Sequence, residues 1–376
     1  MKKTILFFSI SMLLTNCRDP YEIPVKPSDN SLLVVEGVLN SGVGPTKITL
    51  TRSSTTNQFY APKPEVNAQL IVEGKDNTTQ FLTETGSGNY GSAQLNFQPD
   101  MQYRLKINTS NGQQYASDYL KVINTPPIDS VSWKKENDGI MIYINTHDSS
   151  TDAGYYQWDY EETWEYHATY IARYKWDPNT QTIIPMLPGE NFYYCWSNNN
   201  SKNLLLGSSE KFQSDIIYEM PMVFIPKGSE KMNTRYSILV HQHKLDKTGY
   251  EYIQLMKKNT EQLGSIFDPQ PSELRGNIHC LSTPEETVIG YLTACSLKEQ
   301  RIFITSTQAG WSTYTYCDNF KIINHPDTVK ARIPFPYLPF EADKDQAGNI
   351  RGWYISQPNC VDCRVNGGVT VKPAFW

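Results

Sequence analysis

The sequence lacks a long hydrophobic run. Its N-terminal apolar segment, Ile5–Leu14, is about half as long as the roughly 20 residues that a membrane-spanning helix needs, and no later stretch approaches that length. The chain also lacks an excess of basic residues, because its net charge is −5. A nucleic-acid partner requires a basic face that displaces counterions. We therefore predict neither a transmembrane helix nor nucleic-acid binding.

Catalytic motifs are missing too. The sequence contains no Gly-x-Ser-x-Gly elbow, no His-Glu-x-x-His and no phosphate-binding glycine loop. His241–Gln242–His243 would place two imidazoles on one face of a strand, but without a third ligand nearby in sequence a structural role is favoured. Glu161, Glu162 and Glu165 could form a glycosidase pair, yet a salt bridge explains Glu162 on an apolar strand face better. We predict no catalytic residue, no metal and no cofactor.

The first residues have the pattern of an export signal. Lys2 and Lys3 precede the apolar segment, and Leu14-Thr15-Asn16-Cys17 follows it. This tetrapeptide resembles the bacterial lipobox, so we predict a signal peptide at residues 1–16 and acylation of Cys17. The alternative is an ordinary secretory signal that happens to contain a cysteine. Several acyl chains, palmitate among them, would hold the protein firmly at a membrane.

Residues 17–30 are predicted to be a tether between the lipid and the folded part. They contain Pro20, Pro24 and Pro27 and show no apolar periodicity. Proline stiffens a chain and removes backbone donors, so this segment should be semi-extended.

Cysteine usage fits an exported protein. Besides Cys17 the chain has an even number of cysteines, which indicates disulfides in an oxidising compartment. The Cys-x-x-Cys spacing at the C-terminal end could also be half a zinc site or a redox motif, but the second ligand pair or βαβ context is missing. The sequence does not select a pairing among the disulfide candidates, which are Cys195, Cys280, Cys295, Cys317, Cys360 and Cys363.

The fold class is predicted to be mainly β. Short strands separated by turn residues fill residues 31–125, which favours an immunoglobulin-like β-sandwich. Tyr103 would start a strand and hydrogen-bond back to the preceding loop, as in the tyrosine corner of such folds, or simply be a core residue. Residues 126–376 are predicted to form a second, larger β-rich domain with disulfide-stapled irregular segments. Its one inserted helix, at 249–263, would begin with a capping box from Thr248 to Glu251.

An aromatic stripe marks residues 156–176. Every second position from Tyr156 onward is mostly Tyr or Trp, and the intervening positions are mostly polar, which predicts one over-long strand, bent or projecting. As far as Tyr166 a core role is favoured. For Tyr170, Tyr174 and Trp176 a core role and a ligand- or partner-binding role are equally weighted.

Several short stretches together are similar to an uncharacterised lipoprotein family of Bacteroidota, domain of unknown function 4249. The stretches are Cys17-Arg-Asp-Pro-Tyr-Glu, Leu33-Val-Val-Glu-Gly37, Tyr194-Cys195-Trp196, Tyr236-Ser-Ile-Leu-Val240, Gly264-Ser-Ile-Phe-Asp-Pro-Gln-Pro271, Gly276-Asn277-Ile278, Gly290-Tyr291, Arg301-Ile302-Phe303 and Cys360-Val-Asp-Cys363 through Gly367-Gly368 to Pro373. The resemblance implies an exported lipoprotein that accompanies a TonB-dependent outer-membrane transporter. It therefore also implies a location at the outer membrane, on its periplasmic or cell-surface side. It supplies no catalytic residue, because the family defines none.

We therefore expect a non-enzymatic accessory lipoprotein that captures a ligand for a TonB-dependent transporter or covers it. A free-standing glycan- or peptide-binding surface module is the second hypothesis. An exported hydrolase is the third, and it would depend on Glu162.

Overall fold

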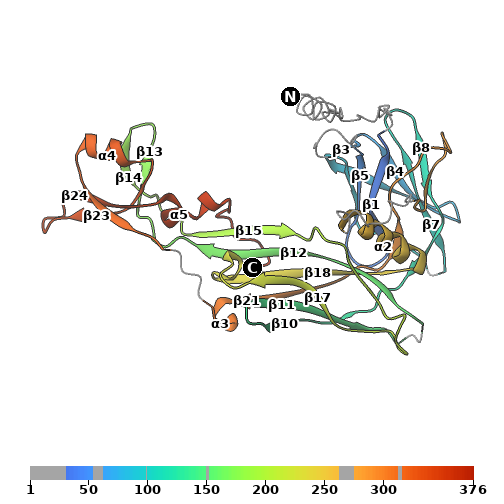
Figure 1. The fold of residues 1–376 in the computed structure, drawn as a ribbon. Helices are drawn as coiled ribbons and strands as arrows, with labels where there is room; N and C mark the ends of the chain where they lie inside the picture. Colours follow the sequence, from blue (N-terminus) through green and yellow to red (C-terminus); the bar gives the residue numbers. More distant parts are fainter. Residues whose placement is uncertain (1–30, 54–61, 99, 150–151, 262–274, 312–315) are drawn as a thin grey trace, which may run out of the picture.

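The computed structural model describes residues 31–53, 62–98, 100–149, 152–261, 275–311 and 316–376. The molecule is elongated, with a barrel at one end, two packed sheets in the middle and a small module at the other end (Figure 1). Cys17, the signal peptide and the tether lie outside the described residues. Within the described ranges, no helix combines the length and the apolar character needed to cross a membrane.

Eight strands close into a barrel. Their order is β7-β4-β5-β6-β2-β1-β20-β9, and β9 pairs back on β7. The bounds are β1 (Leu33–Asn40), β2 (Thr46–Arg52), β4 (Gln69–Gly74), β5 (Thr79–Gly86), β6 (Asn89–Ser92), β7 (Gln102–Asn108), β9 (Leu120–Ile123) and β20 (Thr293–Cys295); β3 (Lys63–Pro64), β8 (Gln114–Ser117) and β19 (Ile278–Cys280) extend the sheet. The mainly β class is confirmed. The immunoglobulin-like sandwich is not, because the hydrogen-bond ladder closes on itself.

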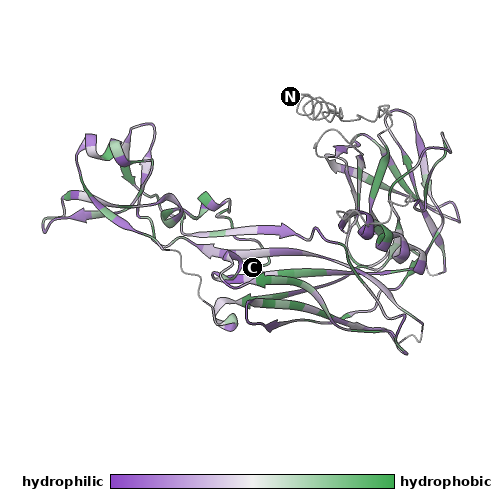
Figure 2. Cartoon of the chain, viewed as in Figure 1, coloured by the Kyte–Doolittle hydropathy of each residue, from purple (hydrophilic) through white to green (hydrophobic). Residues whose placement is uncertain are grey.

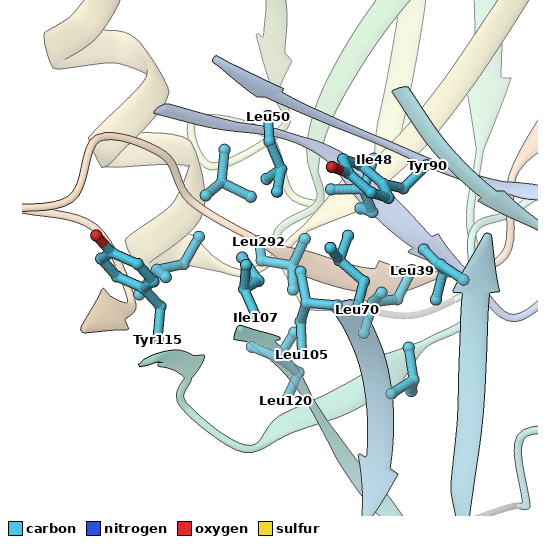
Figure 3. Close-up of a cluster of buried hydrophobic side chains, with 14 of the residues drawn as sticks. Leu39, Ile48, Leu50, Leu70, Tyr90, Leu105, Ile107, Tyr115, Leu120 and Leu292 are labelled. Atoms are coloured by element: carbon cyan, nitrogen blue, oxygen red, sulfur yellow. The ribbon is translucent and has the colours of Figure 1, made fainter. Parts of the chain in front are cut away.

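The closing strand comes from a remote part of the sequence. β20 runs parallel to both neighbours, pairing with β1 on one side and β9 on the other. The barrel therefore includes residues beyond 275, which the predicted range 31–125 did not contain. Its interior is filled by large apolar side chains such as Leu70 and Tyr90 (Figure 3). An eight-stranded barrel of this kind is a packed core.

Tyr103 has the predicted corner geometry within this barrel. Its side chain is buried, and its hydroxyl accepts a hydrogen bond of 2.6 Å from the backbone N–H of Gln98 in the preceding loop. The ring also meets Phe97 edge to face at 4.3 Å. The tyrosine therefore joins strand β7 to its loop although the fold is not a sandwich.

Two sheets form the middle layer of the molecule and share one core. The first contains β10 (Ile128–Lys135), β11 (Gly139–His147) and β17 (Ile216–Pro226); the second contains β12 (Tyr155–His167), β15 (Tyr194–Asn200), β16 (Leu205–Ser208), β18 (Arg235–Leu245) and β21 (Lys298–Thr305). Ile140, Ile142 and Ile144 alternate along β11 and are fully buried against the second sheet. Hydrophobic stretches lie along the strands of both sheets (Figure 2).

The predicted helix is present as α2 (Lys247–Glu261). It begins two residues earlier than expected, since Asp246 rather than Thr248 caps it: the backbone N–H of Gly249 donates to the Asp246 carboxylate at 2.6 Å. Tyr252 and Ile253 bury the inner face of the helix against β12 and β18. Two shorter helical turns are η1 (Glu230–Met232) and α3 (Ser306–Ala309).

The far end of the chain forms what we call the distal module, residues 170–193 and 316–366. It contains β13 (Tyr174–Asp177), β14 (Thr182–Pro185), β22 (Asn319–Ile323), α4 (Pro326–Arg332), β23 (Leu338–Lys344), β24 (Ile350–Ser356), α5 (Pro358–Val361) and η2 (Cys363–Asn366). A small core of its own includes Val329, Ile333, Trp353 and Ile355.

Two disulfides tie the distal module together and to the middle sheets. Cys195 on β15 bonds Cys363, and Cys317 bonds Cys360. The other two candidates were wrong: Cys280 and Cys295 are free, buried thiols. They lie in different strands of the barrel sheet, with Cys280 opposite Tyr115 and Cys295 between Asn40 and Ile123. Their separate neighbours explain why neither finds a partner.

The aromatic stripe is not one strand. β12 ends at His167, where its partner strand β15 also begins, and strand pairing resumes only at Tyr174 in β13. In between, the backbone N–H of Tyr170 donates to the carbonyl of Cys360 at 2.9 Å, outside any ladder. The stripe as far as Tyr166 packs in the core, as expected, and the remainder belongs to the distal module.

Candidate functional site

The distal module carries a small apolar pocket. Its volume is about 210 Å³. β13 forms one wall, and the other walls are Phe192, the stretch from Pro334 into the start of β23, and the stretch from the end of α5 into η2. The lining residues are Tyr174, Lys175, Trp176, Phe192, Pro334, Leu338, Pro339, Val361, Asp362 and Arg364. Aromatic rings and prolines thus surround a space of side-chain size.

The charged groups at the pocket are paired with each other. Arg364 grips the Asp362 carboxylate through two nitrogens, at 2.9 and 2.7 Å, and its guanidinium lies 3.7 Å from the centre of the Phe192 ring. The hydrogen bond with Asp362 raises the pKa of Arg364. Lys175 forms an ion pair with Glu190, and its hydrogen bond lowers the pKa of that carboxyl. These two pairs leave the rim close to neutral.

Two of the three aromatic residues singled out by the sequence line this pocket. Tyr174 and Trp176 project from β13, and Tyr174 also meets Trp353 edge to face at 5.0 Å. Tyr170 does not reach the pocket. Its ring stacks on Phe340 at 4.4 Å, and its hydroxyl donates to the carbonyl of Cys317 at 2.8 Å. Tyr170 is therefore used for packing, whereas Tyr174 and Trp176 both line the pocket and pack against the core of the distal module.

Further apolar side chains of the distal module face solvent. Phe335 adjoins the pocket residue Pro334 in sequence and is 81% exposed. Ile171, Leu187 and Ile323 are also exposed. Neither Phe335 nor the proline walls were singled out by sequence reasoning, because the segment between α4 and β23 has no periodic pattern. Only its Pro-Phe-Pro composition could have indicated a rigid, aromatic surface.

The histidine pair forms a different cluster, near the junction of the barrel and the middle sheets. His241 and His243 share a face of β18, as predicted, and Asp159 of β12 lies between them. The carboxylate bonds His241 Nδ1 at 2.5 Å and His243 Nε2 at 2.9 Å. Burial would lower the pKa of His243, but Asp159, with a contribution from Cys295, raises it to about 9. The sequence around His241 and His243 contains no such carboxylate, because Asp159 comes from the neighbouring strand β12.

This cluster has the composition of an ion-pair network. Burial would raise the pKa of Asp159, but the hydrogen bonds of both imidazoles lower it strongly. Across the described ranges of the chain, no group of three or more His, Cys, Asp or Glu side chains is arranged to hold a metal ion. The one carboxylate of Asp159 therefore favours the charged form of both imidazoles.

Glu162 is held in the core of the middle sheets. Its side chain is 1% exposed, and its oxygens lie 2.6 Å from Lys231 Nζ. Tyr236 and Asn199 donate to the same carboxylate at 2.8 and 3.0 Å. Burial and this carboxylate raise the pKa of Tyr236. The salt bridge expected from the sequence is therefore present, and every neighbour of the carboxylate is a structural partner.

The described residues thus form a mainly β protein with two disulfides and a small apolar pocket at one end. The chain belongs to the family described as domain of unknown function DUF4249, which matches residues 18–301. The match covers the barrel and most of the middle sheets, and it stops before most of the distal module. No curated protein matches the chain.

Among solved structures, the chain is similar to the adhesin InvE of Yersinia pseudotuberculosis. The identity is 13%, the TM-score is 0.14, and the alignment covers 57% of this chain and 57% of the adhesin. This chain thus spans little more than half of that protein. A superposition of this quality supports no argument about the fold or the activity.

Proposed function

We propose that this protein is a non-enzymatic, lipid-anchored accessory protein of the outer membrane, which captures a ligand for a TonB-dependent transporter or covers it. The observation that carries the proposal is the apolar pocket of the distal module, placed at the opposite end of an elongated molecule from the barrel that holds the first described residues (Figure 1). An anchor at Cys17 would leave this pocket far from the lipid.

The predicted tether would add to the distance between the lipid and the folded part. Between Cys17 and Ser31 the chain can extend by at most about 50 Å. The barrel would then stand off the bilayer, and the distal module would project beyond it toward a partner. The family resemblance supports a transporter as that partner, since its members resemble lipoproteins that accompany such transporters.

A catalytic role receives less support. The carboxylate on which a hydrolase would depend, Glu162, is buried in a complete set of hydrogen bonds. The rim charges of the pocket are paired as well. A reacting carboxylate needs access to its substrate, and neither of these groups has it.

Copurification tests the proposal. The full-length chain with a C-terminal tag, expressed in its native host, is extracted from membranes in mild detergent, and the recovered proteins are quantified by mass spectrometry. We expect a TonB-dependent transporter to be enriched with the wild type. The Cys17→Ser variant, which cannot be acylated, should leave the membrane fraction and lose the transporter. Recovery of the wild type alone would overturn the proposal.

A further inference from the structure

We infer that the distal pocket binds an aromatic or proline side chain presented by an extended segment of a partner protein. This inference deepens the proposed function and rests on it for the identity of the partner, but it can be tested on the isolated protein. Four features of the pocket carry it: its size, its neutral rim, its lack of side-chain amides and aliphatic hydroxyls, and its rigidity.

Size limits the ligand to about one ring. The pocket measures about 210 Å³. An apolar protein cavity of about 150 Å³ holds a benzene molecule, whereas drug-sized ligands occupy pockets of about 300 Å³ or more. One phenyl, indole or pyrrolidine ring therefore fits, and a second bulky group would lie outside on the exposed surface around Phe335.

The neutral rim selects against a charged ligand. Arg364 bonds the Asp362 carboxylate through Nε and Nη2, and Lys175 is paired with Glu190. An anionic or cationic ligand would have to compete with the partner charge of one of these pairs and bury its own charge against Trp176 or Leu338. Burying a charge without a partner is strongly unfavourable. The ligand group that enters is thus uncharged.

The lining also disfavours a sugar. Among its ten residues there is no Asn, Gln, Ser or Thr. The remaining polar side-chain groups are the Tyr174 hydroxyl, the Trp176 N–H and charges that are already paired. Most hydroxyl groups of a bound pyranose would therefore lose water without gaining a protein partner, at about 1–3 kcal/mol for each unsatisfied group. A phenyl or pyrrolidine ring has no polar atoms to satisfy, and an indole ring has only one N–H. Extended segments rich in proline dock on aromatic surfaces of this kind, because their backbone is already ordered.

The pocket is held rigid before binding. Val361, Asp362 and Arg364 lie between or beside Cys360 and Cys363, and each of these cysteines is bonded to a different part of the chain. A wall fixed in this way loses little conformational freedom on binding, so more of the contact energy is retained as affinity.

The binding test uses residues 18–376, which lack the predicted signal peptide and the acylated Cys17, labelled with 5-fluorotryptophan. The ¹⁹F resonance of Trp176 is assigned with Trp176→Phe. The probes are the peptide Ac-Pro-Pro-Phe-Pro-Pro-NH₂, the peptide Ac-Gly-Gly-Asp-Gly-Gly-NH₂, which has neither an aromatic ring nor proline, and cellohexaose. We expect the first peptide to shift the Trp176 resonance saturably, and the other two to leave it unchanged. No shift with the first peptide, or a saturable shift with either of the others, would overturn the inference.

Two variants localise the binding. Leu338→Asp places a charge on the pocket wall and should lower the affinity for the first peptide at least about tenfold. Leu187→Asp is the matched control, because this leucine is exposed in the same module but does not line the pocket. If Leu338→Asp fails to fold, Leu338→Gln makes the same comparison with an uncharged side chain. Equal affinities for wild type and both Leu338 variants would contradict the assignment of the pocket.

The outcomes distinguish the two proposals. Peptide binding without a copurifying transporter would retain the pocket assignment and reject the proposed function. Copurification of the transporter with the wild type, but no response of Trp176 to the first peptide, would reject the pocket assignment and retain the function.

Discussion

The cluster around Asp159 predicts a specific dependence of stability on pH. In the folded protein the pKa of His243 is about 9, against an ordinary value of 6.5. The difference corresponds to about 3 kcal/mol between the protonation states. The Asp159 side chain is 44% exposed, so solvent screens part of this interaction, and we expect about 2 kcal/mol.

The sign follows from proton linkage. The pKa of His243 is raised on folding, so its contribution to the free energy of unfolding is fully present below about pH 6.5 and is lost as the pH rises to about 9. The Asp159→Asn substitution removes the negative charge that raises this pKa. The variant should therefore be less stable than the wild type by about 2 kcal/mol near pH 6, and the difference should shrink toward pH 9.5.

Urea unfolding, followed by tryptophan fluorescence at a series of pH values, measures this difference. Asp129→Asn is the control, because its partner His147 is also an imidazole paired with a carboxylate but is 61% exposed. Solvent screening should make the control's effect much smaller. Parallel stability curves for the wild type and Asp159→Asn across this pH range, or equal effects of the two substitutions, would refute the reasoning.

Two further predictions concern the core and the free thiols. Glu162→Gln removes the carboxylate that pairs with Lys231 at a buried site, so it should lower the free energy of unfolding by about 3 kcal/mol in urea titrations. The control Glu219→Gln, at an exposed ion pair, should change it by less than about 1 kcal/mol. Similar values for the two variants would contradict this. When residues 18–376 are unfolded in denaturant without prior reduction, a thiol reagent should label Cys280 and Cys295 alone. Labelling of any of the four disulfide cysteines would show that the pairing is incomplete.

Local patterns in the sequence were enough for several features. The alternation at Ile140, Ile142 and Ile144 placed them in the core of a strand, and the periodic apolar positions around Tyr252 indicated helix α2. The aromatic alternation also indicated that Tyr156–Tyr166 is buried. These predictions were possible because strand and helix periodicity depends only on residues a few positions apart.

Other features depend on which distant strands meet. β20 closes the barrel from a position more than 250 residues after β1, and a three-residue strand leaves no recognisable pattern. Cysteine pairing likewise requires two backbone positions to lie close together in the fold. The Cα atoms of Cys195 and Cys363, for example, are 5.8 Å apart. The sequence therefore indicated disulfides but not that Cys280 and Cys295 would remain free.

The candidate site shows the same division. The sequence by itself determined the residue types, because an alternating aromatic segment could be recognised and Tyr174 and Trp176 singled out within it. Only the tertiary structure decided that they face Leu338 and Arg364 across a pocket while Tyr170 packs on Phe340. Side-chain chemistry is a property of the residue, whereas a binding surface exists only where segments far apart in the chain are brought together, and their contacts leave no local signal.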